Sequence, residues 1–289
     1  MVSVAGVPDV KRSLNRALSR TTGLRLVREN PVTRARPVRG LVPARRELHA
    51  PVFILSSVRS GSTLLRSMLG SHSALYAPHE LHLGDLAAQA TSWFAQTALA
   101  EFGIDEDELT AMLWDRLLAE VLGRSGKPIL VEKTPNHVFL ADRLAQIWPD
   151  ARFVFLLRHP GSIYQSWRAA RPAHGVGDTV DYLRRFCTEV QRARGTLPGI
   201  DVRYERLVAE PEAETRRLCG YLELDWEPGM VDYGSHGHGR YRRGLGDWSA
   251  NIRSGRPQPA RPLPALAEVP RGLRRIARDW GYLADPAAD

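Results

Sequence analysis

Lysine is almost absent from this chain of 289 residues. The three lysines are Lys11, Lys127 and Lys133, so the formal net charge of +8 at pH 7 comes almost entirely from arginine. A basic balance favours anionic ligands, nucleic acid among them. The sequence contains no helix-turn-helix, zinc-finger or aromatic-plus-basic RNA motif, so nucleic acid stays a weak alternative and we expect no such partner.

Cysteine and long apolar runs are scarce as well. The two cysteines, Cys187 and Cys219, form no metal-spaced pair. We therefore expect no metal site, and a single disulfide is possible but not needed. A reduced, cytoplasmic setting is then the default expectation. The absence of any apolar run of about 18 residues predicts no membrane span, and the first residues show no apolar core of a signal peptide.

The most informative stretch is 51–69, which reads PVFILSSVRSGSTLLRSML. Its apolar start predicts a buried strand, and leucine and methionine recur at helical spacing after residue 63. The polar segment between them contains Arg59, Ser60, Gly61, Ser62 and Thr63. The first N–H groups of a helix lack internal partners and lie at the positive end of its dipole, so the loop predicts an anion site. An ordinary strand-to-helix turn with a serine N-cap is the alternative.

This loop is not a standard nucleotide P-loop, because it contains no lysine. The P-loop motif is G-x-x-x-x-G-K-[ST], whereas Ser56 stands where its first glycine belongs and Ser62 where its lysine belongs. Hydrolysis of ATP or GTP would lose the lysine that contacts the β- and γ-phosphates. A kinase that uses nucleoside triphosphates, and a non-catalytic binding module on the same fold, stay as alternative functions.

Further strands are predicted by apolar runs at 128–131, 153–157 and 200–204. Strands that alternate with helices predict an α/β fold with a central parallel sheet. We expect a loop over 71–78 and a helical cap insertion over about 81–125. Other expected segments are helices over 85–123, 211–223 and 266–281, a helix containing Ile163 and Trp167, a loop over 168–180, and a long basic loop over 234–262.

Charged residues follow two of these strands, at the carboxyl ends where open parallel sheets bind ligands. Glu132-Lys133-Thr134-Pro135 follows one strand, and we expect Thr134 to be the N-cap of the next helix. Arg158 follows another strand, and Ser166 lies on the helix behind it. The pattern of buried strand, cationic loop and helix N-terminus thus occurs twice, which predicts a ligand with two anionic groups.

Residues 1–48 form a separate, arginine-rich segment, and residues 49–289 the main domain. Apolar residues at helical spacing predict a short basic amphipathic helix over about 9–20. Such a helix suits an acidic carrier protein, a membrane surface or a homodimer contact. A solvated arm without a partner is the simpler interpretation.

Together these segments resemble the sulfotransferases that use 3′-phosphoadenosine 5′-phosphosulfate (PAPS), over roughly residues 51–260. The resemblance implies a P-loop-like three-layer α/β/α fold and a PAPS site. It assigns the arginine-type loop (Arg59, Ser60, Gly61, Ser62 and Thr63) to the 5′-phosphosulfate, and Arg158 with Ser166 to the 3′-phosphate. Tyr204, in a Tyr-Glu-Arg-Leu segment, is placed near the adenosine, and Arg242, Arg243 and Gly244 in a loop that closes on the nucleotide.

The resemblance also implies which groups carry the reaction. His79-Glu80-Leu81-His82 is similar to a segment of bacterial members linked to polyketide assembly lines, and Glu80 matches the carboxylate of the tyrosyl-protein branch. Glu80 is therefore the first candidate for the general base and His82 the second. Arg59 and Lys133 would neutralise negative charge on the sulfuryl and phosphate oxygens. Structural roles for Glu80, His82 and Lys133 remain open, with Asp142 as another partner for Lys133.

The expected activity is transfer of a sulfuryl group from PAPS to a hydroxyl of a small-molecule or carrier-tethered acceptor, by in-line displacement and without a metal. The cap over 81–125 and the loop over 168–180 are expected to line the acceptor site. The arginine bias and the soluble character suggest a bacterial enzyme of specialised metabolism.

Overall fold

A parallel β-sheet forms the centre of the computed structural model, which describes residues 46–235, 250–259 and 261–283. Within these residues its five strands lie in the order β2-β3-β1-β4-β5. The strands are β1 (Val52–Ser56), β2 (Leu75–Tyr76), β3 (Ile129–Glu132), β4 (Arg152–Leu157) and β5 (Gly199–Arg203). The expected α/β fold with a central parallel sheet is confirmed.

Strand β1 is the middle strand, and each of its residues is buried. It pairs with β4 along its whole length, from Val52 opposite Arg152 to Ser56 opposite Leu156, and with β3 on its other side. A strand that is covered on both faces has no polar side to present, which explains its unbroken apolar run. Strand β2 lies inside the predicted loop over 71–78, because a two-residue strand is too short to show an apolar pattern.

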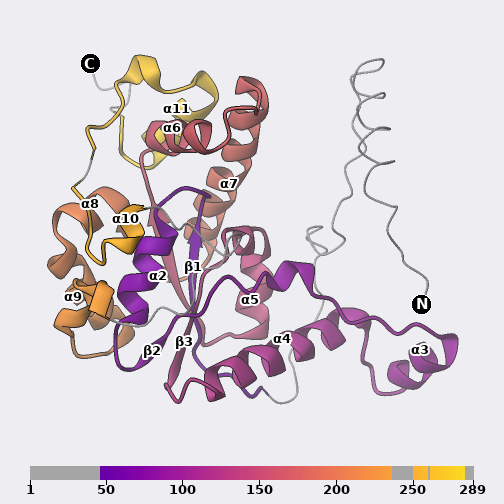
Figure 1. Ribbon diagram of the computed structural model, residues 1–289. Coiled ribbons are helices and arrows are strands. Elements are labelled where there is room, and N and C mark those ends of the chain that lie inside the picture. Colours follow the sequence, from indigo (N-terminus) through magenta and orange to yellow (C-terminus); the bar gives the residue numbers. More distant parts are fainter. Residues whose placement is uncertain (1–45, 236–249, 260, 284–289) are drawn as a thin grey trace, which may run out of the picture. The chain divides into compact units, whose positions relative to one another are not determined.

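Helices cover both faces of the sheet and complete a three-layer α/β/α arrangement (Figure 1). Val52 and Ile54 pack with apolar residues of α2, α8 and α9 on one face. Phe53 lies on the other face, against the rings of Trp148 and Phe153. The α-helices are α2 (Ser62–Gly70), α3 (Trp93–Ala100), α4 (Glu106–Gly123), α5 (Ala141–Ile147), α6 (Pro160–Ala170), α7 (Val176–Thr196), α8 (Tyr204–Ala209), α9 (Pro211–Leu222), α10 (Ala250–Arg253) and α11 (Arg271–Asp279).

Short 3₁₀ helices connect several of these elements, and they are η2 (Leu83–Asp85), η3 (Pro135–Leu140), η4 (Pro228–Met230), η5 (Tyr233–Ser235) and η6 (Leu266–Glu268). Thr134 is the N-cap residue of η3, as the sequence predicts. Its side chain makes no capping hydrogen bond and instead donates to Glu132. None of the helices among the described residues is long and apolar enough to cross a membrane. Cys187 and Cys219 are buried and free, so they form no disulfide.

Three predicted segment boundaries are wrong. The helical region over 85–123 begins only at Trp93 and is divided into α3 and α4. The loop predicted over 168–180 is shorter in the structure, because α6 continues to Ala170 and α7 begins at Val176. The apolar face of α7 packs against α6 and α11. The last helix is likewise divided, into η6 and α11. The expected helix over 9–20 lies outside the described residues.

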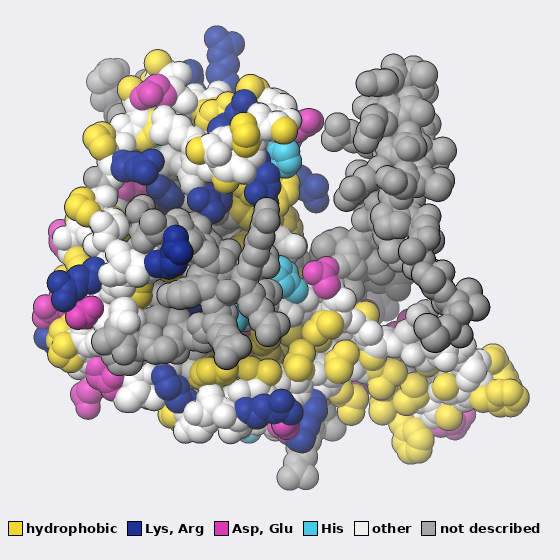
Figure 2. Space-filling view, in the orientation of Figure 1, with side chains coloured by type: hydrophobic (Ala, Val, Ile, Leu, Met, Phe, Trp, Pro, Cys, Tyr) yellow, Lys and Arg dark blue, Asp and Glu magenta, His cyan; other side chains and the backbone are white. Residues whose placement is uncertain are grey.

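The α3 segment carries large apolar side chains on its surface. None of the α3 residues is buried, and Trp93 and Phe94 are 68% and 77% exposed. Figure 2 shows hydrophobic side chains gathered over this part of the molecule and along α4. Helix α4, in contrast, is anchored in the domain by Trp114, whose indole N–H donates to the carbonyl of Leu86 at 3.0 Å.

Candidate active site

The site residues predicted from the sequence follow the carboxyl ends of the five strands. Along the order of the sheet, Glu80 and His82 come after β2, Lys133 after β3, and the Arg59 loop after β1. Arg158 comes after β4 and Tyr204 after β5. Because all five strands are parallel, these segments emerge at the same edge of the sheet.

The turn between β1 and α2 depends on two unusual backbone conformations. Arg59 has φ 60° and Gly61 has φ 90°, both in the left-handed region. A Cβ atom at Gly61 would collide with the Tyr204 ring, so glycine is required for two independent reasons. Helix α2 begins directly after this turn, at Ser62, and its first N–H groups have no partners within the helix.

The two predicted anion-binding segments touch each other. The Arg59 Nε atom donates to Ser166 Oγ on α6 at 3.1 Å, and Arg158 Nη1 donates to the Arg59 carbonyl at 2.9 Å. The Arg158 guanidinium lies over the Tyr204 ring, 4.3 Å from its centroid. Arg59, Arg158, Ser166 and Tyr204 therefore form one cluster, although they come from four different segments.

Two buried polar atoms in the Arg59 and Arg158 segments have no hydrogen-bond partner in the described part of the chain, Ser60 Oγ and Arg158 Nε. Leaving a buried polar group unpaired costs about 1–3 kcal/mol. Burial also lowers the pKa of the Arg158 guanidinium, against the opposing influence of Tyr204 and Glu205. These donors fit an anionic ligand with phosphate groups, such as PAPS.

Glu80, His82 and Lys133 meet on the β2–β3 side of this edge. The Lys133 ammonium is fully buried and forms an ion pair with the Glu80 carboxylate. His82 Nε2 lies 3.4 Å from the other Glu80 oxygen, and His82 Nδ1 lies 3.9 Å from Asp85. Burial lowers the pKa of Lys133, although the charge of Glu80 opposes the shift.

Lys133 does not pair with Asp142, the alternative that the sequence left open. Asp142 instead pairs with Arg192 at 2.8 Å. The lysine side chain turns to the loop after β2, because β2 lies beside β3 in the sheet. Glu80 is thus the carboxylate that the lysine contacts.

Several residues that support this cluster were missed in the sequence. Arg66 on α2 is buried and donates to the carbonyl of Ala77 at 2.8 Å, just before the Glu80 segment. Its signal was a charged residue inside the apolar stripe of a predicted helix. Glu132 and His137 form a second buried contact, 2.6 Å between Oε2 and Nδ1. Charged side chains at the end of a buried strand were its signal.

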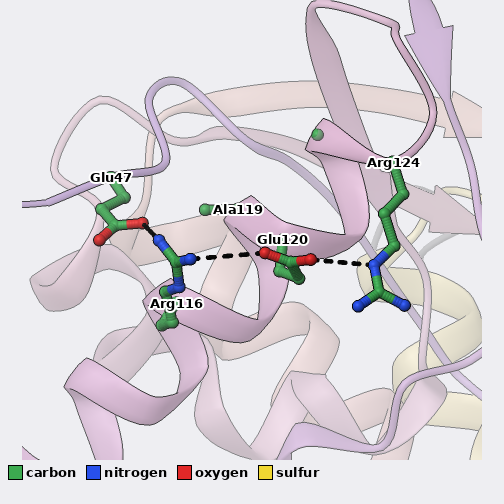
Figure 3. A pocket seen from close by; sticks show the side chains of 6 residues that line it. Glu47, Arg116, Ala119, Glu120 and Arg124 are labelled. Atoms are coloured by element: carbon green, nitrogen blue, oxygen red, sulfur yellow. Dashed lines mark hydrogen bonds and ion pairs between the residues drawn. The ribbon is translucent and has the colours of Figure 1, made fainter.

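The predicted nucleotide-closing residues Arg242, Arg243 and Gly244 lie outside the described residues. A surface depression on α4 has no connection with the site. Its lining residues are Glu47, Arg116, Ala119, Glu120, Gly123 and Arg124, and exposed ion pairs join their charges (Figure 3). The carboxyl-terminal half of α4 leads to the amino end of β3, so the depression lies near the opposite edge of the sheet.

Comparison with known proteins shows the family of the chain. A family model described as the sulfotransferase family matches residues 51–228, more than half of the chain. The chain belongs to the sulfotransferase family. This sulfotransferase is 28% identical over 208 residues to the nodulation protein NoeE of Sinorhizobium fredii (strain NBRC 101917 / NGR234), covering 60% of this chain and 50% of that protein.

A second relative is protein-tyrosine sulfotransferase 1 of Danio rerio, 25% identical over 197 residues, with 63% of this chain and 55% of that protein covered. The chain thus spans about half the length of these curated relatives. Solved structures share the fold over nearly their whole length. The sulfotransferase domain from the curacin biosynthetic pathway has a TM-score of 0.59 at 22% identity, covering 82% of this chain and 99% of that domain.

The sulfotransferase domain of the Synechococcus PCC 7002 olefin synthase gives a TM-score of 0.61 at 23% identity, covering 86% of this chain and all of that domain. The P-loop-like sulfotransferase fold expected from the sequence is therefore confirmed.

Proposed function

We propose that this protein transfers a sulfuryl group from PAPS to a hydroxyl group, with Glu80 as the general base. The observation that carries the proposal is the order of groups along one sheet edge. The Glu80 carboxylate follows β2, the basic loop at Arg59 follows β1, and the Arg158 segment follows β4. A donor with phosphates on its 5′ and 3′ sides fits the basic part of this row, and a hydroxyl acceptor fits beside Glu80.

PAPS supplies the sulfuryl group when bound. The chain's own residues bind and orient the donor and accept a proton from the attacking hydroxyl. Arg59, Ser60 and the N-terminus of α2 would hold the phosphosulfate. Arg158 and Ser166 would hold the 3′-phosphate. Donors that are fixed before the reaction stabilise charge more effectively than water does, because they need no reorganisation.

Glu80 accepts the proton of the attacking hydroxyl in this scheme. General base catalysis contributes roughly 10²–10⁴-fold to a rate. The carboxylate is only 13% exposed and is fixed from two sides, by Lys133 and by His82. Lys133 fixes the position of the Glu80 carboxylate, and its charge would also stabilise negative charge on the sulfuryl oxygens.

For the acceptor we propose a small molecule or a carrier-tethered chain that binds beside Glu80 under the segment 81–125. The exposed Trp93 and Phe94 on α3 give this segment an apolar surface. The match to the sulfotransferase family supports a hydroxylated acceptor without specifying which. We also retain the basic segment 1–48 as a candidate contact for an acidic carrier protein or a second copy of the chain, in a bacterial cytoplasmic enzyme of specialised metabolism.

Ligand binding tests the donor part of the proposal. In a thermal-shift titration, adenosine 3′,5′-bisphosphate should stabilise the protein and ATP with Mg²⁺ should not. Arg59→Ala should abolish the shift. Stabilisation by ATP with Mg²⁺ alone would favour the kinase alternative.

Turnover of PAPS tests the base. Glu80→Gln keeps the shape of the side chain and removes its basicity, so turnover with a panel of phenols and sugars should fall by about 10²-fold or more. Its affinity for adenosine 3′,5′-bisphosphate, measured by calorimetry, should stay near that of the wild type. Full activity of Glu80→Gln would show that another group is the base.

A further inference from the structure

The segment that carries Glu80 and His82 is attached to the loop after β3 through its backbone. No helix or strand covers residues 77–82, so the hydrogen bonds of regular secondary structure do not fix this segment. Three successive N–H groups nevertheless each donate to one side chain of the segment 132–137. The contacts are Leu81 N to Glu132 Oε1 at 3.1 Å, His82 N to Thr134 Oγ1 at 3.3 Å, and Leu83 N to His137 Nε2 at 3.2 Å.

These three acceptors are also joined to one another. The Thr134 hydroxyl donates to Glu132 Oε1 at 2.8 Å, and Glu132 Oε2 lies 2.6 Å from His137 Nδ1. All three residues are at most 1% exposed, so water does not replace these bonds. We call Glu132, Thr134 and His137 the amide clamp.

The clamp fixes the protonation pattern of its histidine. A backbone N–H can donate only to a lone pair, so the Leu83 contact requires that His137 Nε2 carries no proton. The proton of the neutral ring is then on Nδ1, 2.6 Å from Glu132 Oε2.

We propose that the amide clamp positions the Glu80 carboxylate for proton abstraction, with Glu132, Thr134 and His137 as positioning residues that touch neither donor nor acceptor. The inference rests on the proposed role of Glu80 as base. His82, which follows the clamped Leu81, has φ 49°, a conformation that non-glycine residues rarely adopt. Such strain persists only where surrounding contacts enforce it, and the clamp supplies these contacts.

Glu132→Gln is the sharpest test, because an amide cannot serve both neighbours. If its oxygen accepts from Leu81 N–H, its NH₂ group faces the Nδ1–H of His137, and two donors meet. The ring then changes to the Nε2–H tautomer, and His137 can no longer accept the hydrogen bond from the Leu83 N–H. If the amide is turned round, Leu81 loses its acceptor. We expect faster hydrogen exchange of the amides of 81–83, and a change in the ¹⁵N shifts of His137 where the tautomer changes.

The kinetic result expected for Glu132→Gln is a fall in kcat of about 10²-fold, as for a small misplacement of a reacting group. The affinity for adenosine 3′,5′-bisphosphate should not change, since the clamp touches no predicted nucleotide ligand. A fall in kcat without faster exchange of the three amides would overturn the positioning role. Unchanged exchange, tautomer and kcat would overturn the clamp itself.

A matched control is provided by Asp115, a buried carboxylate that also holds backbone amides. It accepts from the N–H of Glu47 at 2.7 Å and from the indole of Trp148 at 2.8 Å, away from the site. Asp115→Asn should lower the free energy of unfolding while leaving kcat and the exchange of residues 81–83 unchanged. Equal kinetic losses in Asp115→Asn and Glu132→Gln would mean that general destabilisation explains both, and the proposal would fail.

Thr134 offers a second, milder pair of variants in case Glu132→Gln does not fold. Thr134→Val removes the hydroxyl at constant shape and should lower kcat, with faster exchange of the His82 amide. Thr134→Ser restores the hydroxyl and should restore both. If Glu80→Gln remains active while these exchange results hold, the clamp stands and the base assignment falls. If Glu80→Gln is inactive while Thr134→Val behaves as wild type, the base stands and the clamp falls.

Discussion

The Lys133 ammonium and the Glu80 carboxylate form an ion pair that is almost entirely closed to solvent, with side chains 1% and 13% exposed. The two residues come from the loops after neighbouring strands, β3 and β2. Attraction between charges is stronger in such a site than in water, but each charge also loses hydration. The two charges are therefore tightly coupled. Removing one of them leaves the other buried without a partner, which destabilises the folded protein.

Lys133→Met should destabilise the protein by about 3 kcal/mol, the size typical of a broken buried pair. The reason is that the Glu80 carboxylate, only 13% exposed, would lose its ammonium partner. Urea denaturation measures the effect. The double variant Glu80→Gln with Lys133→Met contains neither charge and should be more stable than Lys133→Met alone. If the double variant is no more stable, the two charges are not coupled.

The contribution of Lys133 to stability should increase with pH in the alkaline range. Burial lowers its pKa in the folded protein below the ordinary value of about 10.4. Between the folded and the unfolded pKa, the unfolded chain binds more protons, so stability rises with pH across that window. The difference in unfolding free energy between wild type and Lys133→Met should therefore rise as the pH approaches about 10.4. A difference that is flat or falls would contradict the lowered pKa.

The sequence predicts those parts of the site that depend on local pattern. Strands β1 and β4 are found because their burial on both faces leaves continuous apolar runs, and the Arg59 loop follows from its small polar residues before a helical stripe. The partnership of Lys133 with Glu80 could not be predicted, because it depends on β2 pairing with β3. A two-residue strand leaves no pattern. The resemblance placed both residues near the reaction, but no sequence pattern indicated that side chains 53 positions apart would pair.

The amide clamp could not be predicted from the sequence for a related reason. Glu132 and His137 belong to a segment whose resemblance to known sulfotransferases drew attention to Lys133. Their partners are backbone N–H groups, which every residue has and no sequence pattern marks. Helix α7 was missed although its apolar residues have helical spacing, since Gly175 and Gly177 near its start are typical of loops.

Gly61→Ala should be far more harmful than an alanine at another glycine with positive φ. At Gly61 a Cβ atom would meet the Tyr204 ring, whereas at Gly103, with φ 70°, it would meet nothing within 4 Å. Both variants carry the backbone cost of roughly 1–2 kcal/mol. Only Gly61→Ala adds overpacking, typically about 1–3 kcal/mol.

Thermal denaturation of the two variants measures this difference. Gly61→Ala should in addition lose affinity for adenosine 3′,5′-bisphosphate, because Tyr204 supports the Arg158 guanidinium. Adding Tyr204→Ala should recover part of the stability by removing the collision, but not the affinity. Equal losses in Gly61→Ala and Gly103→Ala would show that the ring contact is unimportant.

Ser166→Ala tests whether the contact between the two anion segments matters for binding. The serine hydroxyl accepts from Arg59 Nε at 3.1 Å and is also a predicted ligand of the 3′-phosphate. Losing one such hydrogen bond costs about 1–1.5 kcal/mol, so the affinity for adenosine 3′,5′-bisphosphate should fall about tenfold in calorimetry. Gln165→Ala, an exposed change one residue earlier on α6, is the matched control and should bind as the wild type does. Adenosine 5′-phosphosulfate, which lacks the 3′-phosphate, should lose less affinity on Ser166→Ala than the bisphosphate does. Equal losses for the two nucleotides would place Ser166 with the Arg59 loop alone and remove it from the 3′-phosphate site.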